Sequence, residues 1–505
     1  MMVSGLILSM TATSANRAAL GAGAIVMDVI ARDDGRQAYQ KIRRIRSLRP
    51  DMILLAGGTD GGASAHVIEI LELIKAAEPK PRLGVGYQLP IVYAGNKVLR
   101  PQVEKLLSED FALEVVDNLR PVLEVENTEP ARRAVHELFM EHVMSHAPGY
   151  TRLMKWTDVD IMPTPAGEGM AMQLIADTYK ENVLGVGLGG ATTNVYSVMG
   201  GRFVRSVSAN LGMSYSVTNV MKEAGIGNIM RWIPFDLDEE EVSSRLMNKM
   251  IRPTTIPQTL EDLIVEHSVA REALRLGLEH HKTIATRLKG IQLQRTIADI
   301  FDQEVEETYI KMMDIDVFAG TGGLLSHAPR RVQPMFILTD AWLPEGVTKM
   351  FQDSVFMMPH LGVLSTVYRD AAWNIFDKDC LVRLGTCIAP AGTGRPGENV
   401  MTVELEMPDE GTIEEKLALG EIKRISLAER QEAEAVITPA KNFDMGEGPG
   451  KSIQRTIMGG IGGVLLDARG RPLALPEEYD ARKELLLSWF RALDLYPEEK
   501  LKGLV

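Results

Sequence analysis

The stretch GVGLGGATTNVYSVMGGRFVRSV, residues 185–207, is the part of the sequence that decides the fold. With the residues before it, it contains three short β segments, NVLGVGL, TTNVYSV and RFVRSV, joined by the glycine links GGA and MGGR. Short links with glycine connect neighbouring antiparallel strands, so the stretch predicts a β-meander. A glycine turn also lets backbone N–H groups approach anionic oxygens without a Cβ in the way. The first turn is therefore either a phosphate-binding hairpin or a purely structural one.

The residues after this turn exclude two other kinds of phosphate site. A P-loop or a dinucleotide fingerprint requires a helix directly after the glycines, so that the helix N-terminus faces the phosphates. Here the segment TTNVYSV is rich in β-forming residues, and a second glycine turn follows it. The pattern favours a β-hairpin that clasps phosphate with its backbone.

A second glycine loop lies far along the chain. The segment DVFAGTGGLLSHAP ends a hydrophobic strand with Gly320, Gly322 and Gly323. Together the two loops resemble the superfamily of actin, sugar kinases and large heat-shock chaperones, in which a hairpin grips the phosphates and a later glycine loop contacts the adenosine. The resemblance implies ATP and Mg²⁺ as ligands and a nucleotide-binding set of Gly189, Gly190, Thr192, Thr193, Asn194, Gly320, Thr321, Gly322 and Gly323.

An ordered set of motifs extends the resemblance over residues 17 to 495. The motifs are ILLAGGTDGG, PIVYAGN, MPTPAG, GGATTNVYSV, NLGMSYS, GTGGLLSHAP, MMPHLGVLS, PAKNFDMGEGPG and GGVLLDARGRPLALP. In this order they resemble the accessory protein family of cobalamin-dependent glutamate mutase, the MutL type. The resemblance implies a chaperone-like accessory or reactivating factor for an adenosylcobalamin-dependent mutase, with the mutase subunits as its partners.

Two departures from the family pattern concern hydrolysis. The family's hairpin looks like D-V-G-G-A-T-T-D-V, whereas this sequence has Gly187 and Asn194 at the two acid positions. Without the first carboxylate, magnesium loses a ligand and developing charge loses stabilisation. Family members also have an earlier D-x-G-S-T-T-T-K hairpin, and this sequence starts after its position, so we expect either that the sequence is truncated or that a partner chain supplies that half. We expect weak ATP binding or impaired hydrolysis, and the sequence identifies no catalytic residue.

The rest of the sequence predicts an α/β fold in several parts. Alternating apolar strands and amphipathic helices over 1–125 predict a parallel α/β domain covered on both faces. Residues 126–181 are expected to be a helical connection, and 182–394 an actin-like (ribonuclease H-like) nucleotide-binding lobe with a helical insertion at 237–312. Residues 395–505 are expected to be a small β-rich C-terminal domain.

A further candidate ligand loop lies in the first domain. The loop of Gly57, Gly58, Thr59 and Asp60 ends a strand before a helix, where ligands collect in open α/β sheets. Asp60 is expected either to cap that helix or to bind a ligand. The domain's layout also looks like the cobalamin-binding domains of the mutases. No D-x-H-x-x-G motif is present, however, so no direct cobalamin ligation is expected.

Composition limits the alternatives. The 505 residues carry a formal charge of −13, which argues against nucleic acid as a partner. No signal peptide or membrane-spanning run is apparent, and no metal-ligand spacing is found, so we expect a cytoplasmic protein without a metal cluster. Two other functions stay open: a small-molecule kinase of the sugar-kinase type, which needs an aspartate base, and a scaffold with a decayed nucleotide site.

Overall fold

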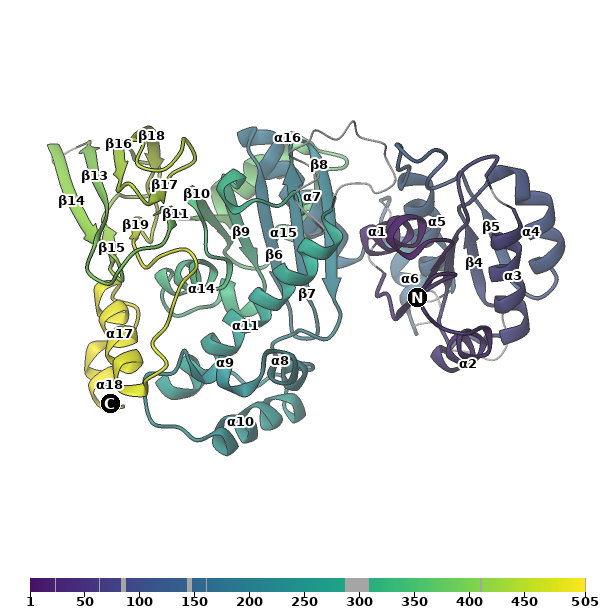
Figure 1. Cartoon of the computed structure of the whole chain (residues 1–505), viewed down its shortest axis with the longest axis horizontal. Coiled ribbons are helices and arrows are strands. Elements are labelled where there is room, and N and C mark those ends of the chain that lie inside the picture. The colour runs from purple at the N-terminus through teal and green to yellow at the C-terminus, as the bar shows by residue number, and fades with distance from the viewer. Residues whose placement is uncertain are drawn as a thin grey trace. The chain divides into compact units, whose positions relative to one another are not determined.

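The computed structural model describes residues 1–504 except 23, 63, 83–87, 143–147, 160, 287–307 and 409–410. The chain divides into two compact units (Figure 1). Unit 1 comprises Met1–Ala166 with Val204–Val207 and Thr283–Tyr309. Unit 2 comprises Gly167–Phe203, Ser208–Lys282 and Ile310–Val505.

Unit 1 contains a parallel five-stranded sheet in the order β2-β1-β3-β4-β5. The strands are β1 (Met2–Gly5), β2 (Asp28–Ala31), β3 (Ile53–Ala56), β4 (Pro90–Tyr93) and β5 (Ala112–Val115). They alternate with the helices α1 (Thr13–Gly21), α2 (Ala38–Leu48), α3 (Ala65–Ala77), α4 (Arg100–Leu107) and α5 (Glu129–His142). The predicted parallel α/β arrangement is confirmed, and its strand order is that of flavodoxin-like sheets.

The sequence-based assignment of the first strand is partly wrong. The segment GAGAIVMDVI (residues 21–30) is apolar and small enough to predict one continuous strand, but it begins with Gly21, the last residue of α1, and only Asp28–Ala31 forms β2. The interior strand β1, between β2 and β3, is the segment MVSG, four residues long and fully buried. A run this short shows no periodicity, so only its neighbours β2 and β3 reveal it as a strand.

Successive residues of these strands face opposite sides of the sheet, which explains why both faces are covered. Ile53 and Leu55 of β3 contact the core formed with α2, α3 and α4, whereas Leu54 contacts the core formed with α1 and α5. The second core is built largely from alanines, which lets α1 and α5 approach the sheet closely. Strands buried on both faces read as continuous apolar runs, as the sequence shows.

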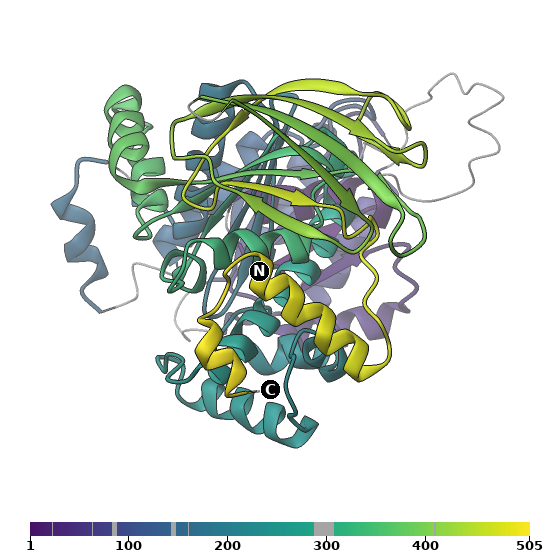
Figure 2. The ribbon, with the colours of Figure 1, turned by 90° about the vertical axis from the view of Figure 1, so that its left-hand side faces the viewer.

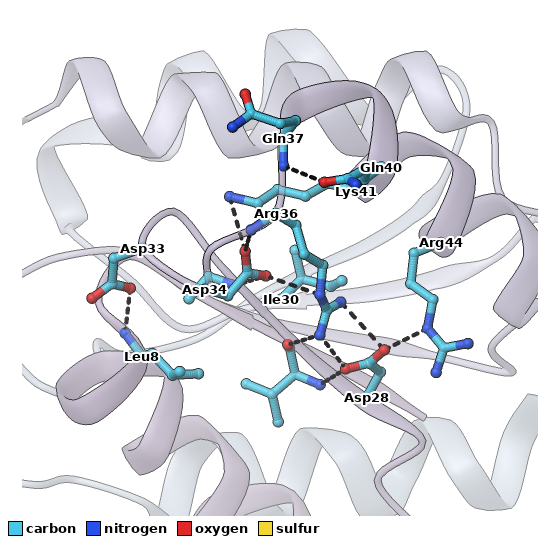
Figure 3. Close-up of polar contacts among 12 residues, drawn as sticks. Leu8, Asp28, Ile30, Asp33, Asp34, Arg36, Gln37, Gln40, Lys41 and Arg44 are labelled. Carbon is cyan, nitrogen blue, oxygen red and sulfur yellow. Dashed lines mark hydrogen bonds and ion pairs between the residues drawn. The ribbon is translucent and has the colours of Figure 1, made fainter.

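Charged side chains connect β2 to α2 (Figure 3). Asp28, the first residue of β2, accepts hydrogen bonds from Arg36 at 2.9 Å and from Arg44 at 2.5 Å. Asp34 in the connecting turn pairs with Lys41 at 3.2 Å, and both side chains are buried. Burial alone would raise the pKa of Asp28, but the hydrogen bonds from Arg36 and Arg44 lower it below its usual value.

We expect Asp28→Asn to lower the free energy of unfolding by about 1 kcal/mol, because its two arginine partners are partly exposed. The stabilisation is present above the unfolded pKa of an aspartate and is lost as the pH falls through the lowered folded pKa, so the substitution should matter less in acid. Chemical denaturation at neutral and acidic pH measures both effects. Glu69→Gln, which removes an exposed pair with Arg32, is the control and should change little.

Unit 2 is built on an eight-stranded mixed sheet in the order β15-β19-β11-β10-β9-β6-β7-β8. Its first strands are β6 (Val183–Leu188), β7 (Thr193–Met199) and β8 (Arg202–Ser208), the predicted meander, with a turn at Gly200 and Gly201 between β7 and β8. The middle of β8, Val204–Val207, is grouped with unit 1. Strands β9 (Val317–Thr321) and β10 (Gly346–Asp353) continue the sheet, with β9 parallel to both β6 and β10. β11 (Leu381–Ala389) is antiparallel to β10.

Helices cover both faces of this sheet. α11 (Leu260–Ile284) runs along β6 and β7, where Gly277 lies against Thr193 and Val195 (Figure 1). α7 (Thr164–Tyr179) and α15 (Met358–Leu364) lie on the other face and cross at Gly167 and Gly362, where a Cβ would overlap the facing backbone. The other helices are α8 (Val217–Ala224), α9 (Ile226–Met230), α10 (Glu239–Ile251), α13 (Gly323–Ser326), α14 (Val332–Trp342) and α16 (Arg369–Ile375).

The C-terminal region is rich in β-structure, as predicted, but part of it belongs to the large sheet. β19 (Val464–Asp467) is parallel to β11, and β15 (Ile422–Ile425) is antiparallel to β19. A separate antiparallel sheet contains β13 (Asn399–Met407), β14 (Gly411–Ala418), β16 (Glu432–Pro439) and β18 (Ile453–Met458), seen in yellow-green in Figure 2. Helix α17 (Tyr479–Ala492) follows, and α18 (Glu498–Lys502) lies near the C-terminus. No helix in the described part of the chain is long and apolar enough to cross a membrane.

Candidate functional site

The two glycine loops of the sequence meet at one end of the strands of the unit 2 sheet. β6 and β9 are parallel neighbours, with Gly187 opposite Thr321, so the loops that follow them leave the sheet side by side. Gly322 has a φ of +111°, and a Cβ there would overlap the carbonyl of Leu188. Only glycine permits this approach, which places the end of β9 directly against the hairpin.

The tip of the β6–β7 hairpin presents backbone N–H groups rather than carbonyls. The carbonyls of Gly189 and Gly190 each accept a hydrogen bond of 2.9 Å, from the amides of Met213 and Ser214, and the Ser216 hydroxyl donates to the Ala191 carbonyl. The amides of Gly190, Ala191 and Thr192, in contrast, have no acceptor among the described residues. Three successive free amides in a turn form a concave group of donors suited to an anion.

A cavity of about 820 Å³, here called the hairpin cavity, lies in front of this tip. Gly189 and Gly190 line it from the hairpin, Gly323 lines it from the start of α13 after β9, and segment 253–260 lines it from the approach to α11 and its first residue. Its volume lies in the range of small-molecule sites. The structure therefore brings both predicted loops to one cavity within a single unit.

Most of the ionisable side chains that line the hairpin cavity are basic. Lys249 and Glu266 form an ion pair at 2.7 Å, and burial raises the pKa of Glu266 although Lys249 opposes the shift. Arg330, His327 and Lys500 also line the cavity, and Arg330 pairs with Asp494 at 2.7 Å. These residues come from helices and loops without a recognisable motif, so sequence reasoning missed all of them.

The other predicted residues of this set make contacts inside the protein. The Thr193 hydroxyl donates to the Leu211 carbonyl at 2.5 Å, and the buried Thr321 hydroxyl donates to Asp353 at 3.0 Å. Gly320 is a buried residue of β9 and does not line the cavity, and Thr192 closes the hairpin turn by accepting from the amide of Gly189. Asn194 is buried on the α7 face of the sheet, away from the residues that line the cavity.

A glutamate that sequence reasoning missed fills the space beside Gly187. A Cβ at position 187 would overlap Oε2 of Glu168, a residue of α7 that is 2% exposed. The same oxygen accepts hydrogen bonds from the Tyr196 hydroxyl and, at 3.5 Å, from the Asn194 amide. The strand lacks a carboxylate at position 187, but α7 places one at the same point. Its signal in the sequence is an acid between two glycines in the otherwise small and apolar helix segment AGEGMAM.

Asp353, also missed, organises the end of β10. Its carboxylate accepts from Thr321 and from the amides of Val355, Met357 and Met358 at the start of α15. This network holds the loop in which Phe356 has a φ of 62°, a strained conformation for an aromatic residue. Glu168 and Asp353 thus stand at the same level of the sheet, and both are engaged by neighbouring residues.

The candidate ligand loop of unit 1 is a connector between strand ends. Asp60 accepts from the Lys97 amide at 3.0 Å and from Asn118 at 2.9 Å, and Asn118 also donates to the Gly58 carbonyl. Although burial raises it, the pKa of Asp60 is lowered by the hydrogen bond from the Lys97 amide. The expectation that Asp60 caps α3 is wrong, because Ser64 occupies the N-cap. Gly57 approaches Val67 closely, and Thr59 accepts from the Gly62 amide.

No group of three or more histidine, cysteine, aspartate or glutamate side chains in the described ranges is arranged to hold a metal ion. Cys380 and Cys387 are buried free thiols, and burial raises the pKa of both.

Fold and site together define a two-unit α/β protein in which a glycine hairpin, with backbone amides placed to bind an anion, lies at the strand ends of a mixed sheet. The family described as MutL protein matches residues 1–380, and the chain belongs to this family. A curated relative, Protein MutL of Clostridium tetanomorphum, is 28% identical over 404 residues, which cover 75% of this chain and 82% of the relative.

Proposed function

We propose that this protein is an accessory factor of an adenosylcobalamin-dependent mutase of the glutamate mutase type, and that it binds ATP in the hairpin cavity. Membership of the MutL family supports the accessory role. The observation that carries the nucleotide site is the convergence of Gly190 and Gly323 on one cavity, beside three amides without acceptors among the described residues. A nucleotide supplies phosphate oxygens, which accept hydrogen bonds from such amides.

The strand arrangement supports an actin-like fold for the core of unit 2. The order β8-β7-β6-β9-β10 joins a meander to two further strands that run parallel to β6. This is the arrangement expected of the actin-like, ribonuclease H-like domains that the glycine loops resemble. In such a domain, binding of a ligand at the strand ends can bias a conformational equilibrium that a partner senses.

The described residues fit a phosphate group better than they fit a magnesium ion. Magnesium in nucleotide sites is held by one or two carboxylates together with phosphate oxygens. The two carboxylates at this end of the strands, Glu168 and Asp353, are buried and accept hydrogen bonds from protein donors. We therefore propose binding of ATP with weak or impaired hydrolysis, and we assign no catalytic residue.

The hairpin cavity gives little support to a kinase. A sugar-kinase mechanism needs a carboxylate base within reach of the acceptor hydroxyl. Among the described residues that line the cavity, Glu266 is the only carboxylate, and its partner Lys249 lies 2.7 Å away. A phosphotransfer screen with ATP and common sugars is expected to show no turnover.

We expect saturating ATP to stabilise the protein by about 3 kcal/mol, which thermal denaturation detects as a raised melting temperature. Gly323→Glu should abolish that shift. A Cβ at position 323 meets no heavy atom within 4 Å, so the new side chain costs little stability yet places a negative charge in the cavity. Gly227→Glu, at an equally open glycine outside the cavity, is the matched control and should keep the shift.

A decayed scaffold predicts the opposite result, with no ATP-dependent shift in either the parent protein or the control. The accessory role has its own test, which is co-purification with each purified mutase subunit in the presence and absence of ATP. Loss of binding to both subunits under both conditions would contradict it, whatever the nucleotide result.

A further inference from the structure

A second cavity of unit 2, here called the amino-end cavity, lies at the opposite end of the sheet. Its volume is about 520 Å³, and it is lined by Met312 before β9 and Glu345 before β10. The C-terminal half of α11 forms one side of it, with Arg275, Leu278 and Lys282. None of the residues that line it also lines the hairpin cavity.

Aromatic and aliphatic side chains form the apolar part of its wall. Trp232 and Trp342 are buried, and their indole N–H groups donate to Glu272 and to the Leu274 carbonyl, so the rings are held in place. Leu278 and Leu473 add apolar surface. The cavity therefore combines rigid aromatic walls with room for a small side chain.

Most of the charged groups around the amino-end cavity are already paired. Arg231 and Arg275 share Glu272, at 2.8 and 2.7 Å, and Arg275 also pairs with Glu279. Arg471 pairs with the buried Asp467 at 2.8 Å. These groups are fixed by the fold and leave little net charge for a ligand to neutralise.

Lys282 and Glu345 differ from the rest. Both are half-buried residues that line the cavity, and neither has a hydrogen-bond or ion-pair partner on its side chain among the described residues. Burial lowers the pKa of Lys282, and the charge of Glu345 opposes this shift. Burial raises the pKa of Glu345, and the charges of Arg471 and then Lys282 oppose this shift. The two side chains line the same cavity and act on one another electrostatically, without a hydrogen bond or ion pair between them.

We propose that the amino-end cavity binds a small zwitterion that carries a carboxylate and an ammonium group close together, as an α-amino acid does. The carboxylate of the ligand pairs with Lys282, its ammonium group pairs with Glu345, and an apolar substituent lies between Trp232 and Trp342. A ligand with one charge satisfies only one of the two side chains and leaves the other desolvated without a partner, which costs binding free energy.

The test is a screen of the standard L-amino acids at millimolar concentration, read by tryptophan fluorescence and by the melting temperature. The strongest binder is then compared with two analogues, one that lacks the amino group and one that lacks the carboxylate; for leucine these are 4-methylpentanoate and 3-methylbutylamine. We expect at least one amino acid to bind saturably and both analogues to bind about tenfold more weakly or worse.

Variants connect the binding to the two side chains. Lys282→Met and Glu345→Gln should each weaken binding about tenfold, whereas Lys282→Arg should retain most of it. Lys500→Met, in the hairpin cavity, should leave it unchanged. Thermal melting of the variants without ligand shows whether they are folded.

The proposal is overturned if no amino acid binds, if the analogue that lacks the amino group binds equally well, or if folded Lys282→Met and Glu345→Gln bind like the parent. Titration with ATP tests the hairpin cavity alone, so a negative result for one proposal leaves the other unaffected.

Discussion

Gly187→Asp is expected to lower the free energy of unfolding by about 3 kcal/mol and to confer no ATPase activity. This change restores the acid that the family hairpin has at this position. In the structure the space is already filled, because a Cβ at residue 187 would overlap Oε2 of Glu168. A second carboxylate there would also lie beside the first in a buried environment, and like charges at short range repel.

The double variant Gly187→Asp with Glu168→Ala is the decisive comparison. Removing the glutamate side chain frees the space and leaves one carboxylate near Tyr196 and Asn194. We therefore expect the double variant to recover at least half of the stability lost in the single variant, measured by urea denaturation. Gly227→Asp, at an open glycine of the same unit, is the control. A single variant as stable as the parent would show that Glu168 does not occupy this space.

The second large effect expected is a loss of stability in mild acid. Burial lowers the pKa of His267 and of His281 to about 3. Both are hydrogen-bonded, His267 to Tyr496 at 2.8 Å and His281 to Ser197 at 2.9 Å. Above the unfolded pKa of about 6.5 neither state binds a proton, so the histidines cost nothing. Between about pH 6.5 and about pH 3 the two histidines are protonated in the unfolded chain and neutral in the folded protein, so the free energy of unfolding decreases as the pH is lowered.

Each histidine contributes a slope of about 1.4 kcal/mol per pH unit, so the pair should remove about 5 kcal/mol by pH 4.5. Urea denaturation at a series of pH values measures the slope. His267→Gln and His281→Gln should each lower the free energy of unfolding at pH 8. Each should also make its dependence on pH less steep by about 1.4 kcal/mol per pH unit, which corresponds to one proton fewer taken up on unfolding. The exposed His360, replaced by Gln, is the control. A slope unchanged in both buried variants would contradict the assignment.

The sequence predicted the elements with strong local signals. The meander of residues 183–208 and the hydrophobic strand that ends in the glycines of residues 320–323 follow from apolar or β-branched segments that run into glycine turns, and both are confirmed. The alternation of strands and helices before residue 125 is likewise confirmed from β2 onwards. These patterns are visible because turn chemistry and periodicity act over a few residues.

What the sequence could not show depends on contacts between distant residues. β1 is four residues long, and it is recognised as an interior strand only because β2 and β3 pair with it on either side. Glu168 reaches Gly187 from a different element, so its role follows from side-chain placement across the sheet and not from a motif. The nucleotide assignment of Gly189, Gly190 and Gly323 stays a prediction, although the structure places these residues around one cavity.

The place of β11, β19 and β15 in the large sheet determines where the chain can be shortened. The family match ends at residue 380, directly before β11. A chain cut there would lose the three strands beyond β10, and the paired and buried backbone of β10 would become an unprotected edge. Such edges template intermolecular β-pairing. A protein trimmed to its recognisable family segment should therefore aggregate during expression, and only versions that keep Val464–Asp467 should stay monodisperse in size-exclusion chromatography.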